Sequence, residues 1–533
     1  MKKLAKKLLL LFISIQFVAC EGSLEPHLYG VVDTGNAFNT PADLSAATVA
    51  LYYELRQKGW GPYLFCDGSS FVMDEVSTEE WTTKWSWVAF LNGSWTDADQ
   101  MVKGFYNWTA PNITRCTYTI AKMEESPVAQ SVKDLYIAEV RALRAFFMFD
   151  LYRLYGPMPM ILEADQAINP DPDYKPYRPT SEEVGTFLTT ELRAAADALP
   201  VEQAEYGRIT KGAALHYLLK YYMHEKQWQN ALETANEIIG LNYYELEKDY
   251  ASIFSAQNEG NKELMFVVRA EPLADYGNHT YANILPGDYA SPYGNIVEGW
   301  SGHRMPWEFY DTFDENDRRR ALAQAEYTSK SGATVDLRAS GDVGALPLKY
   351  GIDPEATGTW AGNDKVLDRY AEVLLFKAEA LNELNGEPEY TEAADNTTYH
   401  VLYNPEEIMY YFNMIRYRAG LPGITLADAS DQVKMRQLII RERMIEFACE
   451  GRRYHDLRRW ALAETEENKP VQGMDVTKKT TERDQFYTVV NVVHKYALRS
   501  FDRKMYFYPI PRAVLDKNAK LKQNPGWDGF GDW

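Results

Sequence analysis

Four tryptophans gather in one short stretch of the chain, with polar residues before and among them. The tryptophans fall within 15 residues, and the whole set is Asp74, Glu75, Trp81, Trp85, Trp87, Asn92 and Trp95. A sugar ring has apolar C–H faces and polar edges, so its recognition needs flat aromatic side chains beside carboxylates and amides. This stretch is therefore a candidate saccharide-binding surface. Core packing explains some of the tryptophans as well, and we expect one or two of the four to be exposed.

A second candidate is the segment 293–304, which reads YGNIVEGWSGHR. Its glycines let the backbone approach a ligand closely and adopt positive φ. Trp300 offers a stacking plane and Arg304 a hydrogen-bond donor, with Tyr293 and Asn295 on the same segment. A tight structural turn is an equally good interpretation. Weaker candidates are Trp307 and Trp360.

Catalysis is the alternative to binding. Glycoside hydrolysis needs two carboxyl groups about 5 to 9.5 Å apart, and Glu75, Glu79 and Glu80 lie beside the tryptophans. The sequence, however, has no G-x-S-x-G and no H-E-x-x-H motif. Its eight histidines show no zinc-ligand spacing, and whether Cys66 and Cys116 are bridged stays open. We predict a binding protein with no catalytic residues and no cofactor. No metal ligands are assigned, and whether a metal is bound stays open.

Residues 1–20 have the pattern of an export signal that ends in a lipid-attachment site. Four lysines precede the apolar run 8–18, which is far shorter than the roughly 20 residues needed to span a bilayer. The run leads into Ala19 and Cys20, which resemble a bacterial lipobox, where the cysteine thiol is acylated. We expect residues 1–19 to be removed and Cys20 to be lipidated. The alternative is an ordinary signal peptide with an incidental cysteine.

The charge balance narrows the choice of partner. A net charge of -20 disfavours nucleic acid and anionic membrane surfaces, because both need a basic face. Aromatic residues make up 14% of the chain, which suits partly exposed recognition surfaces. For most of the tyrosines, packing in a helical core is explanation enough.

Helical periodicity supplies the elements that must hold these candidate residues. Apolar residues at 140, 143, 147, 151 and 154 share one helix face, and this helix should stop at Gly156-Pro157. Ser181 opens another helix. Residues 210–240 predict two helices joined near 224–227, with Gly240 as the C-cap. This pair is close in length to the tetratricopeptide unit of about 34 residues.

Further helices are predicted over 366–383, 404–420 and 430–450. The fold class is therefore mostly α, a tetratricopeptide-like helical-repeat scaffold. Two stretches lack this periodicity and are rich in Trp or in Gly, Pro and Tyr, and we interpret them as an irregular, loop-rich inserted lobe. The predicted division is 1–19 signal peptide, 20–40 anchor and tether, 41–65 scaffold, 66–118 Trp-rich insertion, 119–269 scaffold, 270–365 second insertion, and 366–533 scaffold with C-terminal motifs.

Three segments together resemble a known family. They are RALRAFFMFDLYRLYG (141–156), RERMIEFACEGRRYHDLRRW (441–460), and YPIP (508–511) followed by QNPGW (523–527). In this order they resemble the SusD/RagB family, the surface nutrient-binding lipoproteins of Bacteroidetes. Loops of the form Gly-Trp-x-Gly, as at 299–302, recur in that family before a stretch like 309–318.

The resemblance implies a lipid-anchored protein of the outer membrane that faces the cell exterior. It also implies binding of oligo- or polysaccharide and partnership with a SusC-like TonB-dependent transporter. A peptide-binding member of the same family is the alternative function, and a glycoside hydrolase is another. The family motifs themselves should be structural, because Glu442, Glu446 and Glu450 share a helix face beside several arginines and predict an ion-pair network.

Overall fold

The computed structural model describes residues 37–56, 70–83, 88–92, 94–385, 390–391, 398–399, 404–461, 492–494, 497–499 and 506–527. Cys20 and Cys66 lie outside the described residues. Cys116 and Cys449 are buried free thiols. Among the described helices, none combines the length and apolar character that crossing a membrane requires.

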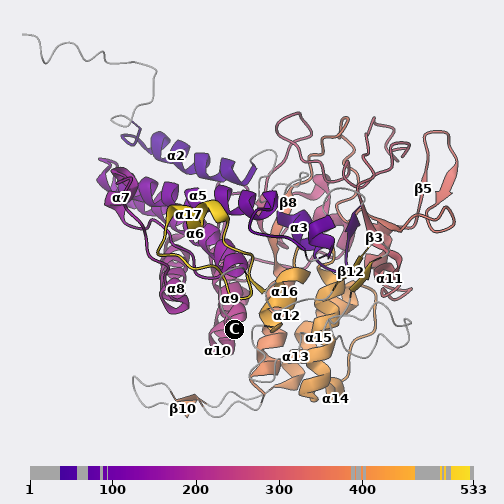
Figure 1. Cartoon of the computed structure of the whole chain (residues 1–533). Coiled ribbons are helices and arrows are strands. Elements are labelled where there is room, and N and C mark those ends of the chain that lie inside the picture. The colour runs from indigo at the N-terminus through magenta and orange to yellow at the C-terminus, as the bar shows by residue number, and fades with distance from the viewer. Residues whose placement is uncertain are drawn as a thin grey trace, which may run out of the picture.

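Helices make up about half of the described residues and strands are few, so the predicted mostly α fold is confirmed. The long helices are α2 (Pro41–Tyr53), α5 (Gln100–Glu125), α6 (Gln130–Tyr155), α8 (Ser181–Ala198), α9 (Lys211–His224), α10 (Trp228–Gly240), α12 (Tyr370–Glu383), α13 (Pro405–Arg418) and α15 (Gln432–Glu446). Each packs against the next, from α5 on α6 to α12 on α13 and α15. Figure 1 shows them as one helical body, with a loop-rich lobe at the upper right.

Shorter elements complete the described chain. The helical ones are η1 (Glu54–Arg56), α3 (Ser70–Val76), α4 (Val88–Asn92), α7 (Ala164–Ile168), η2 (Tyr250–Phe254), η3 (Ala256–Asn258), α11 (Trp307–Tyr310), η4 (Arg318–Leu322), α14 (Leu426–Ala429), α16 (Arg453–Ala461) and α17 (Arg512–Lys517). Two-residue and three-residue strands form the pairs β9 (Tyr390–Thr391) with β10 (Thr398–Tyr399) and β11 (Val492–His494) with β12 (Ala497–Arg499).

Local sequence explains where several helices begin and end. Thr180 and Glu183 form a capping box at the start of α8, and Thr210 caps α9 by accepting from the backbone N–H of Ala213. Gly156 ends α6 at a φ of 71°, as the sequence predicted. The two predicted helices of 210–240 are present, but the C-cap is Leu241 and Gly240 is still helical.

Two predicted helix boundaries were wrong for tertiary reasons. Residues 365–369 form strand β8 (Lys365–Arg369), which pairs with β2 (Leu264–Val268), so α12 starts only at Tyr370. The second half of the range 66–118 was predicted to be irregular, yet it forms α5 with Pro111 inside it. This helix packs along α6, and that burial outweighs the weak helical propensity of its Thr, Asn and Pro residues.

The loop-rich lobe begins and ends at one place, because β2 and β8 are antiparallel neighbours. Within the lobe, β5 (Glu326–Thr328) pairs with β6 (Thr334–Asp336). A four-stranded antiparallel sheet has the order β1 (Thr82–Thr83), β3 (His303–Pro306), β7 (Gly344–Pro347), β4 (Ala323–Gln324). Thr82 is opposite Arg304 in this sheet, so the two candidate stretches of the sequence meet there.

The C-terminal family motif forms the predicted ion-pair network, fully buried beneath the lobe. Arg369 contacts carboxylate oxygens of Glu263 at 2.9 Å, Glu446 at 2.6 Å and Glu450 at 2.7 Å. Arg319 binds the second oxygen of Glu446 at 2.8 Å. These contacts join α15 to β8 and to the lobe, so the motif holds the two parts of the chain together.

Candidate functional site

Three aromatic rings come together on the lobe. The imidazole of His279 lies between two indoles, 4.9 Å from Trp300 and 4.1 Å from Trp360 between ring centroids. Trp300 keeps 38% of its surface exposed, while His279 and Trp360 are half-buried. We call these three residues the aromatic cluster. A partly exposed group of rings of this kind can stack against the apolar face of a ligand.

The inner side of the Trp300 loop is held by backbone contacts. The N–H of Trp300 donates to the carbonyl of Ala282 at 2.7 Å, and the N–H of Ser301 donates to that of Leu285 at 2.9 Å. Gly299 cannot be replaced without movement, because a Cβ there would lie 2.1 Å from the Leu285 carbonyl oxygen. The glycine of the Gly-Trp-x-Gly pattern therefore allows the backbone at 299–301 to pack closely against that of Ala282 and Leu285. This packing places Trp300 at the surface.

The outer side of the same loop is fastened to residues 353–360. The side-chain amide of Asn295 donates to the carbonyls of Asp353 at 3.2 Å and Ala356 at 2.8 Å. The N–H of Glu298 donates to the carbonyl of Gly358 at 2.7 Å. Asn295, predicted as a ligand contact, thus uses its donors to position the loop. Its contacts also fix the distance between the segments that carry Trp300 and Trp360.

Arg304 lies beneath the cluster and is almost fully buried. Its guanidinium donates to the carbonyl of Ile284 at 2.8 Å, to the hydroxyl of Ser301 at 2.7 Å and to Asp342 at 3.2 Å. The sequence suggested a donor to a ligand, but in this structure the donors of Arg304 hold the loop from below. Burial lowers the pKa of Arg304.

The surface around the cluster is apolar as well as aromatic. Large apolar side chains are exposed at Leu273, Tyr276, Tyr293, Ile296 and Trp300, all on the lobe. Tyr293, a predicted contact, is 57% exposed. Arg56, at the end of η1, lies over the ring of Tyr276 at 5.6 Å and donates to the Tyr276 carbonyl. So many exposed apolar groups on adjacent segments are typical of a binding surface.

The first Trp-rich stretch has a different role where the structure describes it. Trp81 is fully buried, stacks on His303 at 5.1 Å and donates to the Cys449 sulfur at 3.3 Å. Burial lowers the pKa of His303 to about 3, so this imidazole is neutral. Trp95 is also buried, stacked on Phe90 at 5.4 Å. Both indoles are core residues in this structure.

The polar residues of that stretch are also internal. Asp74 contacts His455 at 3.0 Å, and Glu75 accepts from the backbone N–H of Gly451 at 2.6 Å; both carboxyls are buried. Trp85 and Trp87 lie outside the described residues, and Asn92 is described only as the last residue of α4. A role for these three in binding stays a prediction.

Two members of the aromatic cluster were missed or undervalued from the sequence. His279 was not selected, and Trp360 was a weak candidate. They lie 81 positions apart, as 360 minus 279 gives, and no local spacing links them. The signal that could have found them is the density of Gly, Pro and aromatic residues across the whole lobe.

A statistical model of the SusD family matches residues 322–527. These residues include Arg369, Glu446 and Glu450 of the ion-pair network and the two C-terminal motifs.

Over these residues the chain is similar to the SusD family.

Relatives with SusD-like names match this chain over most of its length. It is 27% identical over 484 residues to the SusD-like protein P2 of Formosa agariphila, covering 86% of this chain and 90% of that protein. The fold matches a crystal structure of a SusD-like protein from Bacteroides fragilis with a TM-score of 0.71, at 22% identity, over 93% and 99% of the two chains. It also matches surface glycan-binding protein A from Bacteroides thetaiotaomicron in complex with laminarihexaose, with a TM-score of 0.67 at 20% identity, over 91% and 99%.

One buried cluster of the helical body has the residue types of a metal site. His216, Asp368 and Glu372 are buried with ligand atoms within 4.8 Å of one another. Lys220, however, contacts Asp368 directly and lies 3.7 Å from Glu372. Arg452 reaches the same two carboxylates at 3.4 and 3.6 Å. An ammonium and a guanidinium already balance the negative charge, so these residues fit a structural ion-pair cluster and not a cation site.

Proposed function

We propose that this protein is a lipid-anchored, surface-exposed glycan-binding protein of the outer membrane. It captures an oligo- or polysaccharide and passes it to a SusC-like TonB-dependent transporter. The observation that carries the binding role is the aromatic cluster of His279, Trp300 and Trp360, held by two loops of the lobe. Rings with one exposed face suit the apolar faces of sugar residues.

The neighbourhood of the cluster supports a carbohydrate over a peptide. Tyr276 and Tyr293 add exposed rings with hydroxyl groups, and Arg56 holds the Tyr276 segment through its backbone carbonyl. A saccharide presents apolar C–H faces and hydroxyl edges, and tyrosine side chains can contact both, the faces with the ring and the edges with the hydroxyl group. The similarity in fold to a glycan-binding protein solved with laminarihexaose agrees with this proposal and makes laminarin the first polymer to test.

Affinity gel electrophoresis tests the binding role. The purified chain should be retarded in gels that contain one class of polysaccharide among laminarin, xylan, mannan and starch, and Trp300→Ala should migrate as in a gel without polymer. Trp307→Ala, whose ring lies under Arg338 at 4.2 Å, is the matched control and should stay retarded. Absence of retardation in all four gels, or equal retardation of Trp300→Ala, contradicts the proposal.

The same samples separate binding from turnover. A binding protein should release no reducing ends from the retarding polymer during prolonged incubation. Release that persists after repurification would favour the glycoside hydrolase. Retention of peptides in place of glycans would favour the peptide-binding alternative.

The transporter partnership has its own experiment. A lipid-tethered binder outside the cell needs an outer-membrane protein to move its ligand inward. Stable protein complexes usually bury more than about 1,200 Å² in total, so mild detergent extraction of the tagged chain should recover a TonB-dependent barrel protein with it. Recovery of the tagged chain alone, after cross-linking in cells grown on the glycan, would contradict this partnership.

A further inference from the structure

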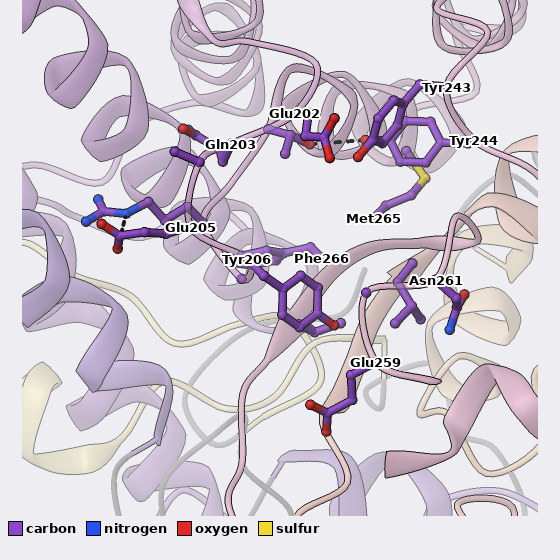
Figure 2. Close-up of a pocket in the computed structure, with 17 residues that line it drawn as sticks. Glu202, Gln203, Glu205, Tyr206, Tyr243, Tyr244, Glu259, Asn261, Met265 and Phe266 are labelled. Carbon is purple, nitrogen blue, oxygen red and sulfur yellow. Dashed lines mark hydrogen bonds and ion pairs between the residues drawn. The ribbon is translucent and has the colours of Figure 1, made fainter. Parts of the chain in front are cut away.

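A cavity of about 410 Å³ lies where the helical body meets the lobe (Figure 2). Its walls are the loop between α8 and α9 at residues 202–210, the turn after α10 at 243–244, residues 259–261 and strand β2. Ligand pockets in proteins usually measure about 300–1,000 Å³, so this space suits a small ligand. No member of the aromatic cluster lines it, and the two features are separate.

The cavity has an aromatic rim and an apolar floor. Tyr206 on the rim is 39% exposed, and Tyr243 is half-buried. Tyr244, Met265 and Phe266 are buried beneath them. In Figure 2 the ring of Tyr206 and the pair of tyrosines stand on opposite sides of the open space. Two ring walls over an apolar floor can receive a flat ligand with apolar faces.

Polar groups that can form hydrogen bonds with a ligand also line the cavity. Glu202 is exposed and has no ion-pair partner among the described residues. The Gln203 amide donates to the carbonyl of Ile209 at 2.9 Å, which leaves its oxygen without a donor in the part of the chain that the structure describes. Burial and the nearby Asp364 carboxylate raise the pKa of Glu259 to about 8. A protonated Glu259 can both donate and accept near neutral pH.

The charges around the cavity are largely balanced from within the chain. Arg208 binds Glu205 at 2.9 Å, Lys262 lies 3.5 Å from the centre of the Tyr243 ring, and Arg269 lies 5.5 Å from that of Tyr206. A cationic ligand would be repelled by the positive charges of Lys262 and Arg269 beside these rings. An anionic ligand would meet the unpaired carboxylate of Glu202. The remaining class is a neutral ligand with several hydroxyl groups.

We propose that this cavity is a second saccharide-binding site, which takes one or two neutral sugar residues between Tyr206 and Tyr243. Glu202 and the oxygen of Gln203 accept hydrogen bonds from sugar hydroxyls, and Glu259 donates or accepts one. The proposal does not depend on the aromatic cluster being a binding site. A chain with two separate sites could hold one polymer at two points, and the linked sites would then raise the overall affinity.

Saturation-transfer NMR with the full chain in detergent tests this site with four neutral disaccharides, namely laminaribiose, cellobiose, maltose and xylobiose. Trp300→Ala removes the aromatic cluster, so any signal left in that background reports another site. We expect at least one disaccharide to keep a signal with Trp300→Ala. Adding Tyr206→Ala should weaken that binding by about tenfold or more, because one ring wall is lost.

Two further variants control for folding. Tyr206→Phe keeps the ring and removes only the hydroxyl, so it should bind nearly as the parent does. Glu202→Lys changes an exposed side chain without an ion pair, so it should weaken binding without lowering the melting temperature.

The outcomes separate the two sites. If Trp300→Ala abolishes every disaccharide signal, or if Tyr206→Ala and Glu202→Lys leave the remaining signal unchanged, the cavity is not a saccharide site. The same holds if none of the four disaccharides gives a signal at millimolar concentration. Loss of signal on changing Tyr206 with no effect of Trp300 would keep the cavity site and contradict the aromatic cluster instead.

Discussion

Glu75 accepts a hydrogen bond of 2.6 Å from the backbone N–H of Gly451, across 376 positions of the sequence. Beside it, Glu80 accepts from the N–H of Cys449 at 3.1 Å. The two carboxyl groups are buried, and the second oxygen of each has no hydrogen-bond partner among the described residues. Burial raises the pKa of both groups, and the charge of Glu75 raises that of Glu80 further, which favours protonation of one of the two. This acid pair ties α3 and the turn that follows it to the C-terminal family motif.

The acid pair predicts a loss of stability as the pH rises. Burial raises the pKa of Glu75 from 4.5 to about 7. A carboxyl group with a raised pKa in the folded state contributes its full stabilisation at pH values below its pKa in the unfolded chain. That contribution is lost as the pH passes through about 7. Glu80→Gln removes one of the two titrating carboxyl groups and supplies a permanent amide donor. The melting temperature of the wild type should therefore fall by several degrees more than that of Glu80→Gln between about pH 5 and pH 8.

Glu182→Gln, an exposed change in the first turn of α8, is the control for the acid pair and should follow the wild type. Parallel curves for the wild type and Glu80→Gln would contradict protonation within the pair.

The tryptophans should divide into two groups by stability. Trp81→Ala removes a fully buried indole that packs on His303, and it should lower the free energy of unfolding by about 3–5 kcal/mol. Trp300→Ala removes a partly exposed ring and should cost far less while abolishing polysaccharide retardation. Urea unfolding and affinity gels measure the two effects. A strong loss of stability in Trp300→Ala would mean that its ring is a core residue.

Removing one charge from the buried ion-pair network should lower the stability of the fold. Burial alone would raise the pKa of Glu446, but Arg418, Arg369 and Arg319 hold it well below its usual value. Glu446→Gln leaves these guanidiniums without their shared carboxylate and should destabilise the chain by about 3–5 kcal/mol. Thermal unfolding near neutral pH measures this loss. Glu406→Gln, an exposed change on α13, should be nearly neutral, and an equally small effect of Glu446→Gln would refute the structural role of the network.

The proposed lipid anchor gives a prediction for Cys20, which lies outside the described residues. One acyl chain holds a protein only weakly on a membrane, while two or more give stable attachment. Cys20→Ala should therefore move the protein from the washed membrane fraction to the soluble fraction. Fractionation and immunoblotting measure this change. Membrane retention of the variant after normal signal removal would argue against the anchor.

The helical body could be predicted from the sequence because its signals are local. Thr210 caps α9 and the chain breaks near His224, and both follow from residue types a few positions apart. The ion-pair network was predictable in part for the same reason, since Glu442 and Glu446 recur at helical spacing on α15. The predicted helix 430–450, however, ends at Glu446, and Glu450 lies in the turn that follows it. The predicted lipid site at Cys20 also rests on adjacent residues alone.

Only the tertiary structure decided which rings are exposed. Trp81 and Trp300 have the same chemistry and both lie beside polar residues, yet one is covered by the turn at Cys449 and the other stays at the surface. His279 reaches Trp360 only because the lobe folds back on itself. The exposure of a side chain depends on which distant segment packs over it. The spacing of neighbouring residues does not predict that segment.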